Sequence, residues 1–67
     1  MIKLMEGNST WYFNPSSFMY AQVDRDKNGY VNVLYVKFSY FDYYLGLTFE
    51  GEWAELNYKA IEKYLTN

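Results

Sequence analysis

The sequence predicts a small α+β domain, in which a twisted antiparallel sheet of four to five strands carries one C-terminal amphipathic helix on one face. Three observations predict this fold. Short runs of aromatic and β-branched residues, which favour strands, alternate with turn signals. Residues 53–65 place apolar side chains at helical spacing. The 67 residues contain no repeat or linker, so we expect a single domain spanning 1–67.

The first two predicted strands are residues 2–5 and 10–13, each a short run of mostly apolar or aromatic residues. Residues 6–8 between them, Glu-Gly-Asn, favour a hairpin loop. The next segment, 14–17, begins with Asn-Pro, and proline has no N–H to give to a strand ladder. We therefore expect strand pairing to break after residue 13.

Residues 18–24 are predicted to form the third strand and residues 43–49 the last. The hairpin that follows the third strand contains Asn28-Gly29, a dipeptide that supplies the positive φ of a primed two-residue turn. Gly46 lies inside the last strand, where a glycine marks either a bulge or the close approach of another group.

Residues 30–40 form the longest predicted strand, and its side chains alternate between two faces. One face carries Tyr30, Asn32, Leu34, Val36, Phe38 and Tyr40. The other carries Val31, Val33, Tyr35, Lys37, Ser39 and Phe41. A sheet with one solvated face alternates between apolar and polar residues, whereas both faces here are largely apolar. The predicted helix covers only one face, so we expect a partner, such as a second copy of the chain, to cover the other.

The predicted helix presents one apolar stripe, made of Trp53, Leu56, Ala60, Ile61, Tyr64 and Leu65. Glu52 and Glu55 lie near its start and Lys63 near its end, an order that suits the helix dipole. We expect this stripe to pack against the sheet.

The composition disfavours several classes of function. The chain has no His and no Cys, and therefore lacks the commonest general base and the commonest zinc ligands. No nucleophile motif is present either, so we expect neither enzymatic activity nor a cofactor. The net charge of −2 disfavours non-specific binding to nucleic acid. No apolar run reaches the roughly 18 residues of a membrane-spanning helix, and no signal peptide is recognisable. We expect no membrane association and a cytoplasmic location, in the host if the chain is virus-encoded.

Residues 24–32 match the first half of an EF-hand calcium loop, with oxygen-bearing side chains and Gly29 at the sixth position. The twelfth position is Tyr35 instead of glutamate, and both flanks predict strands instead of helices. The pattern favours a polar hairpin turn, with calcium binding as the alternative.

Aromatic residues make up 24% of the chain, more than a small monomer buries easily. Large aromatic side chains also dominate binding energies at protein interfaces. The candidate partner-binding residues are Trp11, Tyr12, Val33, Tyr35, Phe41, Tyr43 and Tyr44. The same rings could stack on the bases of single-stranded nucleic acid, although Lys37 is the one basic residue within the aromatic run.

The N-terminal part of the chain contains Met1-Ile2-Lys3-Leu4, Gly7 in the first predicted loop and Tyr12-Phe13-Asn14-Pro15. In these residues the sequence resembles the FlbD family of short flagellar-operon proteins, and it is similar to short β-rich phage proteins. Glu50 and Glu55-Leu56 stand roughly where the closing helix of that family begins. Residues 30–49 depart from the family by being richer in Tyr and Phe. The resemblance implies a small, non-enzymatic interaction fold and brings no catalytic residues.

The sequence as a whole therefore predicts a small non-enzymatic protein-binding module that associates with itself. It would act as a phage-type accessory or inhibitor protein by covering a partner's surface. One alternative is a binder of single-stranded nucleic acid or of a nucleotide through an aromatic sheet face. Another is a structural subunit of a larger assembly.

Overall fold

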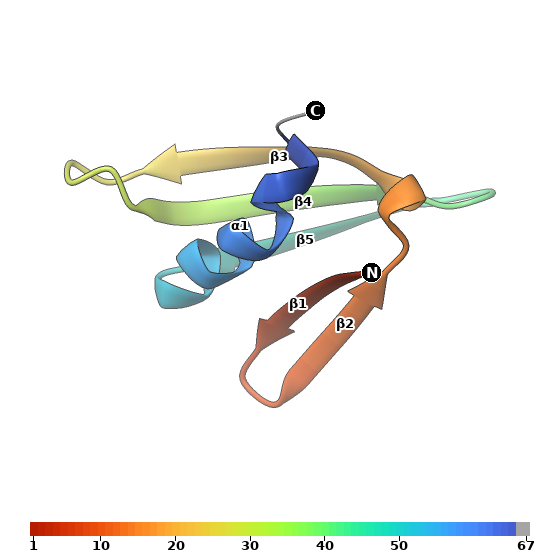
Figure 1. The fold of residues 1–67 in the computed structure, drawn as a ribbon, viewed down its shortest axis with the longest axis horizontal. Helices are drawn as coiled ribbons and strands as arrows, with labels where there is room; N and C mark the ends of the chain where they lie inside the picture. The colour runs from red at the N-terminus through yellow and green to blue at the C-terminus, as the bar shows by residue number, and fades with distance from the viewer. Residues whose placement is uncertain (66–67) are drawn as a thin grey trace.

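The computed structural model describes residues 1–65 and contains five strands and one long helix (Figure 1). In chain order they are β1 (Ile2–Glu6), β2 (Ser9–Phe13), a short 3-10 turn η1 (Pro15–Ser17), β3 (Phe18–Arg25), β4 (Val31–Ser39), β5 (Tyr44–Glu50) and α1 (Glu52–Leu65). All strand pairs are antiparallel, so the predicted α+β class is confirmed. No helix in residues 1–65 is long and apolar enough to cross a membrane.

The strands divide into two sheets instead of forming one. The first is the hairpin β1–β2, and the second has the order β3-β4-β5. The division falls at η1, where Pro15 ends the pairing as its sequence predicts. Asn14 stabilises this turn, because its side-chain oxygen accepts hydrogen bonds from the backbone N–H and the hydroxyl of Ser16, both at 3.0 Å. The chain leaves the turn in a new direction, and the hairpin does not join the larger sheet.

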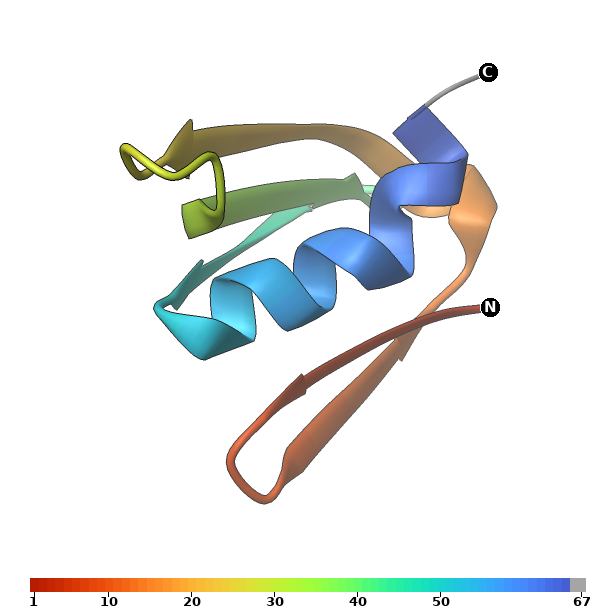
Figure 2. The ribbon, with the colours of Figure 1, turned by 60° about the vertical axis from the view of Figure 1, so that its left-hand side comes forward.

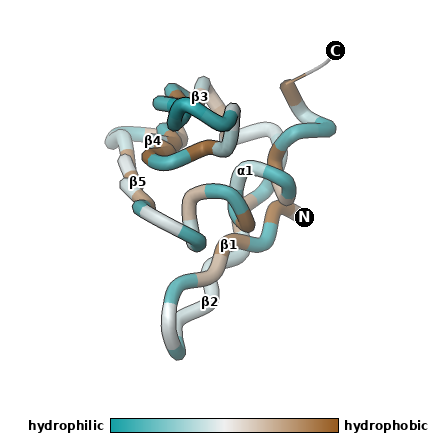
Figure 3. The backbone as a smooth tube through the Cα atoms, turned by 90° about the vertical axis from the view of Figure 1, so that its left-hand side faces the viewer, coloured by the Kyte–Doolittle hydropathy of each residue, from teal (hydrophilic) through white to brown (hydrophobic). Residues whose placement is uncertain are grey.

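The helix α1 lies in the angle between the three-stranded sheet and the β1–β2 hairpin, as Figures 2 and 3 both show. Aromatic contacts join the hairpin directly to the sheet. The ring of Phe13 stacks on Phe38 at a centroid distance of 3.9 Å, and Trp11 meets Phe49 edge-on at 6.0 Å. Ten apolar side chains form the buried core: Ile2, Leu4, Phe13, Val31, Leu34, Val36, Phe38, Phe49, Ala54 and Ile61. Helix and hairpin therefore share one face of the sheet.

The loop between β3 and β4 does not adopt the primed turn predicted from Asn28-Gly29. Gly29 has a φ of 89°, but Asn28 does not have a positive φ, which a type I′ turn would require. Asp26 organises the loop instead. Its carboxylate accepts hydrogen bonds from the backbone N–H groups of Asn28 at 2.9 Å and Tyr30 at 3.0 Å. The aspartate side chain thus stabilises a longer loop in which only the glycine needs the left-handed region.

A bulge in β4 overturns part of the predicted face assignment. Asp24 pairs with Val33 but the next residue, Arg25, pairs with Val31, so Asn32 is an extra residue in the ladder. The bulge turns Val31 into the core, where it is 2% exposed. Tyr30, predicted on the core side with Asn32, is 60% exposed, and Asn32 is exposed as well. Beyond the bulge the predicted alternation is correct, with Leu34, Val36 and Phe38 completely buried.

The buried stripe of α1 is also rotated from the predicted one. The buried positions are Ala54, Asn57 and Ile61. Leu56 and Leu65, which the sequence assigns to the stripe, are 46% and 38% exposed. The predicted stripe is wrong in part because it was chosen from apolar residues, whereas the helix buries the polar Asn57 at the centre of its contact surface.

Asn57 connects the helix to the hairpin by two hydrogen bonds. The backbone N–H of Met5 donates to Asn57 Oδ1 at 2.9 Å, and Asn57 Nδ2 donates to the backbone carbonyl of Met5 at 2.8 Å. The side-chain amide therefore pairs with the edge of β1 as a neighbouring strand would. Asn57 is 0% exposed, and burying an amide is costly unless both of its polar ends are bonded.

We predict that Asn57→Ala destabilises the fold more than Leu56→Ala, although leucine is the more hydrophobic residue. The first change removes both hydrogen bonds and leaves two Met5 backbone groups without their partner, at a cost of roughly 2–4 kcal/mol. The second truncates a half-exposed side chain and should cost less than about 1 kcal/mol. Urea unfolding followed by circular dichroism measures both. Equal losses would contradict the role assigned to Asn57.

Candidate functional site

The face of the three-stranded sheet that points away from α1 is the candidate site, and we call it the outer face. Its side chains come from alternate positions of β3, β4 and β5: Tyr20, Gln22, Asp24, Val33, Tyr35, Lys37, Ser39, Tyr44, Gly46, Thr48 and Glu50. No other element within residues 1–65 covers this face. It is less apolar than the sequence predicts, because the bulge at Asn32 moves Val31 to the core.

The strand register arranges nine residues of the outer face in three rows that cross β3, β4 and β5, and Ser39 pairs with Tyr44 beyond them. The acidic row is Asp24, Val33 and Glu50; the tyrosine row is Gln22, Tyr35 and Thr48; the lysine row is Tyr20, Lys37 and Gly46. Successive rows are two residues apart along each strand, or about 7 Å. The tyrosine row therefore separates the acidic row from the lysine row.

Tyr35 lies flat over Gly46 at the centre of the outer face. A Cβ atom added to Gly46 would meet the hydroxyl of Tyr35 and would lie 2.9 Å from two of its ring carbons. The ring also contacts Tyr20 at a centroid distance of 6.1 Å. The ladder between β4 and β5 is continuous at Gly46, so this glycine allows a close approach and does not mark a bulge.

Lys37, the central residue of the lysine row, lies between the rings of Tyr20 and Tyr44. Its ammonium is 4.9 Å from the ring centroid of Tyr44 and 5.9 Å from that of Tyr20. Both distances fall in the range of a cation–π interaction, which holds the ammonium above the sheet. Lys37 makes no ion pair within residues 1–65.

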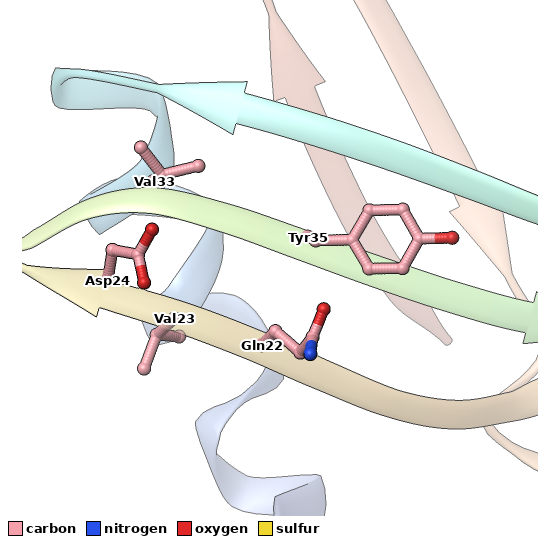
Figure 4. A pocket seen from close by; sticks show the side chains of 5 residues that line it. All are labelled: Gln22, Val23, Asp24, Val33 and Tyr35. Atoms are coloured by element: carbon pink, nitrogen blue, oxygen red, sulfur yellow. The ribbon is translucent and has the colours of Figure 1, made fainter.

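A shallow pocket of about 420 Å³ opens at the acidic end of the outer face (Figure 4). Gln22, Asp24, Val33 and Tyr35 line it with their side chains, whereas the side chain of Val23 points to the opposite side of the sheet. The pocket thus combines an apolar floor, one aromatic wall and a carboxylate. Such a lining fits a side chain with an apolar stem and a cationic end.

Three of the candidate residues predicted from sequence, Val33, Tyr35 and Tyr44, lie together on the outer face. Phe41 is in the β4–β5 turn and is fully exposed, beside the outer face but not on it. Tyr12 is 63% exposed on β2, away from the three-stranded sheet. Trp11 is half-buried against Phe49, so it belongs to the core.

Tyr43, the remaining candidate, stacks on Tyr40 at a centroid distance of 5.2 Å in the β4–β5 turn. Tyr40 in turn lies 6.5 Å from the ring of Phe13, on the core side of the sheet. Burial, and secondarily the neighbouring Tyr43 phenol, raise the pKa of Tyr40 above its ordinary value of 10.0. The pair lies in the turn and not on the outer face, and Tyr43 remains 57% exposed there.

The candidate residues predicted from sequence omit two residues of the outer face that matter for its geometry, Tyr20 and Lys37. Tyr20 is 41% exposed and contacts Tyr35, and Lys37 connects Tyr20 to Tyr44. Phe18, Ala21 and Val23 of β3 pack on the core, and the bulge between Phe18 and Tyr20 turns Tyr20 to the outer face. Alternation therefore identifies Tyr20 only when it is counted back from Val23.

Two carboxylates outside the outer face accept hydrogen bonds from backbone N–H groups. Asp26 accepts two bonds in its loop, and Glu55 Oε2 accepts a hydrogen bond from the backbone N–H of Val31 at 2.8 Å. The part of the chain that the structure describes contains no group of three or more acidic residues placed to hold a metal ion. The half EF-hand pattern at residues 24–32 comprises the end of β3, a hydrogen-bonded loop at residues 26–30 and the start of β4.

Comparison with protein-family models, with characterised proteins and with solved structures yields no match for this chain.

We predict that Gly46→Ala displaces the Tyr35 ring without unfolding the sheet. The added methyl group meets the outer end of a side chain on an uncovered face and can push the ring toward solvent, so the free energy of unfolding should change by less than about 1 kcal/mol. Chemical shifts of the Tyr35 ring protons report the displacement. Ser39→Ala, on the same face but away from the ring, is the control. Unchanged Tyr35 shifts in Gly46→Ala would contradict the close packing.

Tyr40 is expected to make stability fall at alkaline pH. Its folded-state pKa is raised, so its contribution to stability is complete below the ordinary pKa of 10.0 and is lost as the pH rises through the folded value. Tyr40→Phe has no proton to lose, and its free energy of unfolding should decline less above that pH. Urea titrations at a series of alkaline pH values test this. Identical declines in both proteins would show that Tyr40 is not responsible.

Proposed function

We propose that this chain is a small non-enzymatic protein-binding module whose outer face covers a surface of another protein. The observation that carries the proposal is the group of Tyr20, Tyr35 and Tyr44 with Val33 on an uncovered sheet face. Tyrosine is enriched at the centres of protein interfaces, since its ring supplies apolar area while its hydroxyl tolerates water.

The surroundings of these rings also support a binding surface. The packing of Tyr35 over Gly46, with Tyr20 beside it, restricts the ring before any partner arrives. A restricted side chain loses less conformational entropy on binding, which favours affinity. We infer a cytoplasmic accessory or inhibitor protein of the phage type, in which blocking a partner's surface is the whole activity. A structural subunit of a larger assembly would use the same face and would form high-order oligomers in isolation.

A binder of single-stranded nucleic acid or of a nucleotide is the second candidate, and the position of Lys37 between two tyrosine rings favours it. The charge of the outer face argues against it. Asp24 and Glu50 outnumber Lys37, so a polyanion would meet net repulsion.

We predict that Tyr35→Glu abolishes partner binding while Tyr30→Glu does not. A carboxylate at the centre of the face would have to be buried without a partner, which should weaken binding at least about tenfold. Tyr30 is 60% exposed in the β3–β4 loop, so the same change there controls for charge. Quantitative affinity capture from a lysate of the organism that encodes the chain compares the original chain and both variants.

The proposal fails if Tyr35→Glu retains the same proteins as the original chain. A parallel titration with a fluorescent single-stranded oligonucleotide tests the second candidate. Binding that weakens steeply with salt and is lost in Lys37→Glu would favour nucleic acid over protein.

A further inference from the structure

The outer face carries opposite charges at its two ends. Asp24 and Glu50 flank Val33 in the acidic row, and Lys37 occupies the centre of the lysine row. Four residues along β4 separate Val33 from Lys37, a distance of about 13 Å. Lys37 is therefore too far from either carboxylate to neutralise it, and within residues 1–65 neither carboxylate has another cation as an ion-pair partner.

We propose that the outer face binds a second copy of this chain, face to face, about a two-fold axis. The axis lies in the plane of the interface, along the tyrosine row and at right angles to the strands. This inference rests on the proposed function, because it names the partner of the same face. The axis reverses the strand direction and places the lysine row of one copy over the acidic row of the other. Each Lys37 then lies above Val33 of the second copy, between Asp24 and Glu50.

Charge selects this axis over the other face-to-face arrangement. A two-fold axis parallel to the strands would leave each row facing its own copy. Lys37 would then meet Lys37, and the acidic row would meet the acidic row. Like charges in contact across an interface disfavour association strongly. The perpendicular axis instead forms two identical sets of opposite charges, as an isologous dimer requires.

The pocket at the acidic end has the shape and chemistry to receive Lys37 of the second copy. Its apolar floor at Val33 and its wall at Tyr35 fit the aliphatic stem of a lysine. Asp24 in the same pocket fits the ammonium, and Glu50 lies on the other side of Val33. Tyr35 belongs to the row along which the axis passes, so both copies of Tyr35 lie near the centre of the interface.

The size of the face indicates a concentration-dependent dimer. The nine residues of β4 span about 30 Å and three strands span about 14 Å, giving a flat area of about 400 Å² per copy. This area is at the small end of specific interfaces, where complexes are transient.

Sedimentation equilibrium of the full chain tests the dimer, over a range from about 10 μM to about 1 mM. Three samples are compared: the original chain, Lys37→Glu, and the double variant Asp24→Lys with Glu50→Lys. We expect the original chain to dimerise and each charge variant alone to associate at least about tenfold more weakly. An equimolar mixture of the two variants should restore association, because every charge contact in that heterodimer is again between opposite signs. Circular dichroism melting verifies that each variant is folded.

The dimer proposal is overturned if the original chain stays monomeric throughout this range, if neither variant weakens association, or if the mixture does not restore it. Its failure is distinguishable from failure of the proposed function. A monomer whose Tyr35→Glu variant still loses its captured proteins has a binding face for a different protein. If the original chain dimerises but Tyr35→Glu captures the same proteins as the original chain, the proposed binding of another protein is wrong and self-association is retained.

Discussion

The pair of hydrogen bonds between the Asn57 amide and the Met5 backbone is the constraint on which the rest of this structure depends. The hairpin has no ladder to the three-stranded sheet, so backbone pairing cannot orient it. Asn57 supplies that orientation by bonding to the edge of β1, and the stack of Phe13 on Phe38 packs the hairpin against the sheet. Both bonds are made inside the core, where an unpaired amide would be costly, so they specify one arrangement of hairpin, helix and sheet.

This arrangement determines which face of the sheet stays uncovered. Helix and hairpin lie on the same face of the sheet, and nothing else in residues 1–65 covers the opposite one. The aromatic residues divide accordingly. Phe38 and Phe49 are buried, whereas Tyr20 and Tyr44 are exposed on the outer face. A phenylalanine gains only from burial, but a tyrosine hydroxyl needs water or a partner, so the tyrosines suit a surface that is alternately wet and covered.

Much of the fold was predictable because its signals are local. The runs of β-forming residues locate all five strands, and Pro15 locates the break after β2. The candidate site was predictable in part. Val33 and Tyr35 were found because alternation places them opposite the helix. Tyr44 was proposed together with the adjacent Tyr43 for its aromatic ring, and the strand register decides between them. Trp11 was assigned to the surface because nothing local distinguishes a core tryptophan on a hairpin from an exposed one. Asn57 was missed because hydrophobic periodicity discards polar residues, however deeply they are buried.

The sequence by itself determined the number and order of the elements, the single break at Asn14-Pro15 and the aromatic surplus. Turn chemistry and strand propensity depend on a few neighbouring residues, so a short segment of sequence is enough to predict a turn or a strand. Only the tertiary structure decided which face each strand presents and where the hairpin lies. A single extra residue at Asn32 reverses the faces on one side of it, and one buried amide positions the hairpin. Both effects arise from pairing between segments distant in the chain, and this pairing places Lys37 between the rings of Tyr20 and Tyr44 on the open face.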